Sequence, residues 1–108
     1  MPNYNKVQLI GNLAREVELK YSTNGTAIAD MIVAVSESYK DGETQKAYTN
    51  FIEVVAFGKR AEILAEFGNK GDPIFIEGKL RIDKWLDKTT NQPRQKMIVV
   101  VDNSQFLG

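Results

Sequence analysis

The sequence predicts an all-β domain with a single short helix, and three observations support that prediction. Most apolar residues lie in short runs that alternate with polar residues, as in half-buried strands. Turn dipeptides such as Asn24-Gly25 and Asp41-Gly42 separate these runs. Only residues 59–67 carry apolar side chains at helical spacing. Because the chain has 108 residues, we expect one domain over residues 1–108 with one core.

Five strands are expected in chain order. The first covers Asn5–Leu13, bends at Gly11–Asn12 and continues as the short segment Val17–Tyr21. Asn24-Gly25 then favours a tight hairpin, because both residues tolerate positive φ. The later strands are expected at Ala27–Ser36, Thr49–Phe57, Asp72–Trp85 and Lys96–Val101, with polar loops at Tyr39–Tyr48 and Asp87–Pro93.

Lys59–Phe67 predicts the helix, which lies between the third and fourth strands. Ala61 and Leu64 are among the residues at helical spacing, and Gly68 follows where a C-terminal cap is expected. One helix at this place among five strands is the order of an OB-fold, a five-stranded, partly open Greek-key barrel. A generic β-sandwich also fits the strands, but the position of the helix favours the barrel.

The composition excludes several classes of function. The chain has no cysteine and no histidine, so a Ser–His–Asp triad, a cysteine nucleophile and the usual zinc sites are absent. The glycines form no phosphate-binding loop, and the carboxylates lack metal-loop spacing. We therefore expect no enzymatic activity, no cofactor and no metal. Without an apolar run of about 20 residues or a secretory signal, no membrane association is expected and a cytoplasmic location fits.

Charge is unevenly distributed although the net charge is zero. Residues 79–96 carry six basic groups against two acidic ones, a net of +4, whereas residues 1–78 carry eight against eleven. A phosphate chain responds to the local field, because charges beyond a Debye length of about 8–10 Å are screened. The basic stretch indicates either a phosphate-binding surface or a solvated lysine-rich hairpin.

Alternation along two strands separates an apolar face from a mixed one. In the third strand Phe51 and Phe57 share a face with Glu53, and they lie about 20 Å apart at roughly 3.3 Å per residue. The apolar sets are Ile52, Val54 and Ala56 in the third strand, and Ile74, Ile76, Leu80 and Ile82 in the fourth; the mixed sets are Phe51, Glu53, Val55 and Phe57, and Phe75, Glu77, Lys79, Arg81, Asp83 and Trp85.

The mixed faces are typical of single-strand binding. Trp85, the only tryptophan, lies beside Lys79, Arg81 and Lys84. Stacking of a base on an aromatic ring contributes about 1–3 kcal/mol, and lysine and arginine neutralise phosphates. Alternatively, these aromatics pack under loops or in a subunit interface. Tyr39 and Tyr48, at the ends of the long loop, either stack on bases or anchor that loop.

The chain resembles the DNA-binding domain of bacterial single-stranded DNA-binding proteins over its whole length. The matching segments are Asn5-Lys6-Val7, Leu9-Ile10-Gly11-Asn12-Leu13, Tyr21, Asn24-Gly25-Thr26-Ala27, Phe57-Gly58-Lys59, Ala61-Glu62, Lys70-Gly71, Ile76-Glu77-Gly78, Lys84-Trp85 and Leu107-Gly108. The resemblance implies an OB-fold, a homotetramer that wraps single-stranded DNA, and a role in replication, recombination and repair.

The resemblance also implies particular binding residues. Base stacking is expected at Trp85, Phe57, Phe51 and Tyr39, the last two standing where many members have tryptophan. Lys20, Lys59, Lys70 and Arg81 fall at positions that are often basic and are expected to contact phosphates, as are Lys79 on the charged face and Lys84 beside Trp85. Glu53 and Asp83 stand where many members are basic, and Ile52 replaces a frequent histidine. We therefore expect weaker or more salt-sensitive binding, unless Arg81 or a lysine pairs with Glu53.

Members of that family usually continue into a flexible linker and a short acidic tip that recruits replication and repair enzymes. This sequence stops at Gly108, so as given it is expected to bind DNA without that docking site. The other functions considered are a primosomal accessory protein of the same fold, acting mainly through protein contacts, and a carboxylate-based nuclease. No clustered acidic motif supports the nuclease.

Overall fold

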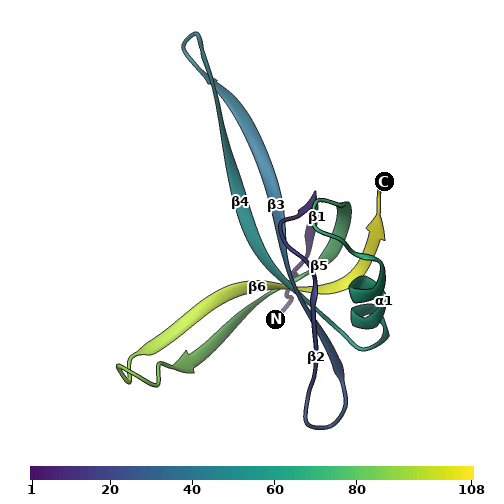
Figure 1. Ribbon diagram of the computed structural model, residues 1–108. Coiled ribbons are helices and arrows are strands. Elements are labelled where there is room, and N and C mark those ends of the chain that lie inside the picture. The colour runs from purple at the N-terminus through teal and green to yellow at the C-terminus, as the bar shows by residue number, and fades with distance from the viewer.

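The computed structural model describes residues 1–108 as a small barrel with one helix and two long hairpins that project from it (Figure 1). The elements are β1 (Val7–Leu13), β2 (Glu18–Tyr21), β3 (Ala27–Asp41), β4 (Thr44–Phe57), α1 (Lys59–Phe67), β5 (Pro73–Leu86) and β6 (Pro93–Phe106). The helix is not long and apolar enough to cross a membrane.

Five strands close the barrel in the order β1-β5-β6-β4-β3, and β3 returns to β1. All pairs are antiparallel except β4–β6, where Val54 lies opposite Val99 in parallel register. β2 pairs with β3 beyond the β1–β3 contact, so β1 and β2 together act as one interrupted strand. This arrangement confirms the predicted OB-fold barrel.

The predicted bend in the first strand is the place where β1 changes partner. Asn12 lies opposite Pro73 of β5 and also opposite Ala34 of β3. A Cβ atom on Gly11 would lie 2.4 Å from the carbonyl oxygen of Ala34, so only glycine permits this close approach. The strand itself begins at Val7 rather than Asn5, although the Asn5 side chain hydrogen-bonds to both backbone polar groups of Leu80.

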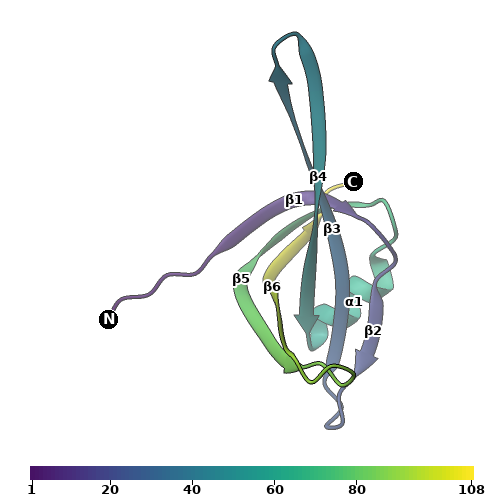
Figure 2. The same cartoon turned by 90° about the vertical axis from the view of Figure 1, so that its left-hand side faces the viewer.

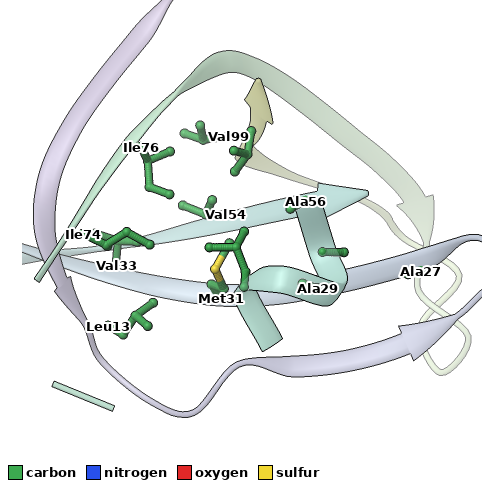
Figure 3. Packing of buried hydrophobic residues seen from close by; sticks show 13 residues of the cluster. Leu13, Ala27, Ala29, Met31, Val33, Val54, Ala56, Ile74, Ile76 and Val99 are labelled. Atoms are coloured by element: carbon green, nitrogen blue, oxygen red, sulfur yellow. The ribbon is translucent and has the colours of Figure 1, made fainter. Parts of the chain in front are cut away.

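The core fills the barrel and rests on the helix. Ile74, Ile76, Val54 and Val99 lie toward one another inside the barrel, with Met31 below them (Figure 3). α1 has the predicted bounds and buries Ala61 and Leu64 against the barrel. Gly68 ends the helix, and its N–H donates to the carbonyl of Leu64 at 2.9 Å.

The β3–β4 hairpin is longer than the sequence predicted. The expected loop Tyr39–Tyr48 is wrong, because β3 and β4 pair as far as Asp41 and Thr44 across a two-residue turn at Gly42. The last strand likewise extends from Pro93 to Phe106. We call residues 36–50 the β3–β4 arm and residues 80–97 the β5–β6 arm; Figure 2 shows the former leaving the barrel.

Two inferences from alternation are wrong. Leu80 and Ile82 are exposed rather than in the core, because β5 has left the barrel there and no helix or sheet covers that side. Val55 is buried although it shares a face with Phe51 and Phe57, since β4 lies between β3 and β6 at this point.

Candidate nucleic-acid interface

The outer face of β4 presents two aromatic rings. In the β3–β4 ladder Phe51 lies opposite Ala34, and Phe57 lies opposite Ile28. Residues separated by an even number along a regular strand lie on the same side of the sheet, so Phe51 and Phe57 share one face. Their side chains remain 67% and 38% exposed, respectively. Both residues are therefore partly accessible to solvent.

A groove of about 390 Å³ lies beside Phe57 and receives residues from five strands. We call it the charged groove; it is lined by Arg15, Lys20, Ile28, Asp30, Met31, Glu53, Val54, Val55, Phe57, Arg81, Asp83, Lys96 and Ile98. Its four cations outnumber its three carboxylates by one. The groove thus combines an apolar wall with nearly balanced charge.

Each carboxylate in the charged groove is paired with a cation of the groove. Lys20 Nζ lies 3.0 Å from Asp30, and Lys96 Nζ lies 3.0 Å from Glu53. Arg81 Nε donates to Asp83 at 2.7 Å. This hydrogen bond from Arg81 lowers the pKa of Asp83 below its usual value. Glu53 is therefore paired with a lysine, Lys96, which balances its negative charge on the binding face.

Arg81 also covers the Phe57 ring. Its guanidinium carbon lies 5.8 Å from the ring centroid, within the range of a cation–π contact. Arg81 and Asp83 occupy positions i and i+2 of β5, so their side chains emerge on the same face of the strand. The same arginine is thus held by a carboxylate and stacked on an aromatic residue.

Trp85 lies farther along the same face, on the β5–β6 arm. It is 47% exposed and lies opposite Arg94 in the ladder. A hollow of about 490 Å³ beside Trp85 is lined by Asp83 and Lys96, which also line the charged groove. A second hollow on the arm brings Lys84 and Arg94 to Trp85. The surface is therefore continuous from Phe57 to Trp85.

Tyr39 lies apart from Phe51, Phe57 and Trp85. The register places Tyr39 opposite Lys46, one step out of phase with the face that carries Phe51. Its ring meets Tyr48 edge to face at 6.0 Å. The Tyr48 hydroxyl donates to Glu37, and this hydrogen bond raises the pKa of Tyr48. The two tyrosines form a separate aromatic pair on the β3–β4 arm.

Some of the predicted basic residues lie beside Phe57, and others lie elsewhere on the molecule. Lys20 and Arg81 line the charged groove, and Lys59 lines a further hollow whose wall is Phe57. Lys79 is exposed on the Arg81 face of β5. Lys70 lies apart, in the loop after α1, where its backbone N–H donates to Glu16.

Sequence reasoning missed three basic residues of the surface around Phe57. Lys96 and Arg15 line the charged groove, and Arg60 joins Lys59 in the hollow beside Phe57. The basic stretch included Lys96, but its role depends on the β5–β6 register, which places it opposite Asp83. No pattern in the sequence singled out Arg15 or Arg60.

A five-stranded barrel that carries exposed aromatic rings and cations along one face defines a nucleic-acid-binding protein of the OB type. The comparisons with known proteins agree. The profile of the single-strand binding protein family matches residues 4–107, so this chain belongs to that family, which consists of binding proteins rather than enzymes. A solved structure, Plasmodium falciparum SSB in complex with ssDNA, superposes with a TM-score of 0.88 at 24% identity and covers 100% of this chain and 98% of that chain.

Proposed function

We propose that the whole chain acts as one domain that binds single-stranded DNA without reading its sequence. The observation that carries this proposal is the continuous surface from Phe57 to Trp85, where Arg81 and Lys96 lie between the two aromatic rings. Rings stack on any base, and cations neutralise any phosphate, so no hydrogen-bond code is needed. The Plasmodium falciparum protein of the same fold is described in complex with ssDNA, which supports the choice of ligand.

The emission of Trp85 tests this proposal directly, because the chain has one tryptophan. We expect oligo-dT to quench the fluorescence strongly and to saturate it, because a stacked base removes the indole from water. Affinity should fall linearly in log–log form with salt, with a slope of about −0.7 for each phosphate neutralised. A duplex of the same sequence serves as the control and should quench weakly.

Three outcomes would contradict the proposal or its assignment of Trp85. Unchanged emission at saturating oligo-dT, with binding measured independently, would remove Trp85 from the interface. Shortening of the oligonucleotide in the presence of Mg²⁺ would instead support the nuclease. Very weak binding with normal folding would favour the primosomal accessory protein, which the internally paired charges of the groove also favour.

We further propose that four copies assemble into a homotetramer. A single chain leaves apolar side chains uncovered on the side of the β5–β6 arm away from Trp85: Leu80, Ile82 and Met97 are exposed there, and Ile82 lies opposite Met97. Ile10 on β1 is 63% exposed. Uncovered apolar patches of this kind mark protein interfaces, and the resemblance to bacterial single-stranded DNA-binding proteins implies four subunits.

Sedimentation velocity over a range of concentrations tests the assembly. We expect a species of four chains at micromolar concentration, because burial of the apolar arm offsets the entropy of association. Ile82→Glu should shift the distribution towards smaller species, whereas Thr89→Glu, at the polar tip of the same arm, should not. A wild-type monomer at micromolar concentration would contradict the tetramer.

In the cell, we propose that the protein covers single strands during replication, recombination and repair. The bacterial cytoplasm, at the nucleoid, is the location that this role requires. Replication and repair enzymes would be recruited through an acidic tip if one is joined to this domain.

A further inference from the structure

Arg81 restricts the access of a base to the Phe57 ring. Asp83 holds the guanidinium through two hydrogen bonds, Nε to Oδ1 at 2.7 Å and Nη2 to Oδ2 at 3.2 Å. This fork fixes the plane and the position of the guanidinium. The group so held lies 5.8 Å from the Phe57 centroid. One aromatic face is therefore occupied by the protein's own side chain.

A base would need the same space. Stacked aromatic groups have centroids about 4.5–7 Å apart, and the Arg81 guanidinium carbon lies within that interval above Phe57. A base that stacks on this face must displace Arg81, or Arg81 must first turn away. The Arg81–Asp83 pair is solvent-accessible, and exposed ion pairs are weak, so another anion of suitable shape can replace Asp83.

We propose that Asp83 acts as a latch that holds Arg81 on Phe57 in the free protein, and that a DNA phosphate takes the place of Asp83 and uncovers the ring. This inference rests on the proposed function and assigns Asp83 as a positioning residue. Phosphate accepts the same two-pronged hydrogen bonding from arginine as a carboxylate does. Phosphate binding and base stacking at Phe57 are thereby coupled, since one contact makes room for the other.

The neighbouring ion pair of Lys96 with Glu53 also supports an exchange of partners in the groove. Lys96, which pairs with Glu53, also lies opposite Asp83 in the β5–β6 ladder. A carboxylate released from Arg81 therefore finds a second cation nearby, and Lys96 already contributes to the low pKa of Asp83. In the charged groove a DNA phosphate replaces a carboxylate that already pairs with the cation. Fewer counterions are therefore released when DNA binds, and the gain in affinity from their release is smaller.

Asp83→Asn tests the latch, because the amide keeps the shape of the side chain and removes its charge. We expect the variant to bind oligo-dT about 2- to 5-fold more tightly at low salt, the range that corresponds to loss of an exposed ion pair. The salt slope should steepen by up to about 0.7. Asp83→Ala, which removes the hydrogen bond as well, should behave in the same way.

Two controls separate the latch from a change of net charge. Asp41→Asn breaks a comparable pair, with Lys46 at 3.1 Å, at the tip of the β3–β4 arm outside the groove. It changes the net charge equally and should leave affinity within measurement error. In an Arg81→Gln background, Asp83→Asn should give no gain, because the residue that it releases is missing.

Three results would contradict the latch. If Asp83→Asn binds more weakly than or as tightly as the wild type, Asp83 does not hold Arg81 away from DNA and the latch is wrong. An equal gain from Asp41→Asn, or a gain that persists without Arg81, would also overturn it. Absence of Trp85 quenching in the wild-type protein would contradict the proposed function instead, so the two failures are distinguishable.

Discussion

Phe57→Ala is expected to bind single-stranded DNA about 5- to 150-fold more weakly than the wild type. The factor corresponds to the loss of about 1–3 kcal/mol for one stacked base. Phe57 borders both the charged groove and the hollow lined by Lys59 and Arg60, so its ring lies where both parts of the surface meet. The variant leaves the Arg81–Asp83 ion pair in place, so no cation is freed to offset this loss.

The fold should survive this change. Phe57 is the last residue of β4 and is 38% exposed, whereas its neighbour Ala56 is fully buried. Oligo-dT titration would measure affinity, and urea denaturation would measure the free energy of unfolding. Phe67→Ala is a matched control, because that ring is 59% exposed on α1 and borders a different hollow.

The outcomes discriminate between two roles for the ring. Loss of DNA affinity with intact stability, absent in Phe67→Ala, would assign Phe57 to the interface. Unfolding of Phe57→Ala would place the residue in the core. Unchanged affinity would mean that bases bypass the ring.

The barrel could be predicted from the sequence because each of its elements carries its own local signal. The apolar residues of Lys59–Phe67 repeat at helical spacing, and those of β4 alternate, so helix and strand are distinguished without tertiary information. The β3–β4 arm could not be predicted, because residues 36–50 are mostly polar and have no core to face. Its strands are held by the hydrogen-bonded ladder from the barrel outward, which is a consequence of topology rather than composition.

The exposed aromatic residues of the candidate site were predictable by the same alternation. Phe51, Phe57 and Trp85 share exposed faces because strand periodicity requires it. Lys70 was predicted from family resemblance alone, and that resemblance also decided in favour of stacking for Tyr39, but the structure places neither beside the charged groove. The ion pair of Glu53 with Lys96 joins distant residues, and only the β4–β6 contact brings those strands together.

Gly78→Ala is expected to cause the largest loss of stability of any single change considered. Gly78 lies in β5 where the register with β6 slips, leaving Asp102 without a partner. A Cβ atom there would lie 2.0 Å from the carbonyl oxygen of Val100. That contact involves backbone, which has no alternative rotamer, so the strands must separate. We expect a loss of more than about 3 kcal/mol, above the usual range for overpacking.

Gly25→Ala is the matched control for this change. Gly25 has a φ of 88° and nothing within 4 Å of an added Cβ atom, so alanine there meets only backbone strain of about 1–2 kcal/mol. Urea denaturation of both variants would compare the two costs directly. Equal losses would contradict the prediction, because the contact at Gly78 would then cost no more than the backbone strain at Gly25.

Because of the position of Gly78, Gly78→Ala should affect DNA binding as well as stability. The tight crossing of β5 and β6 lies immediately before the β5–β6 arm, which carries Arg81 and Trp85 away from the barrel. If Gly78→Ala folds at low temperature, the arm should point in a different direction relative to Phe57. Trp85 quenching would then persist while the contribution of Phe57 to affinity falls, because one strand of DNA could no longer follow both parts of the surface.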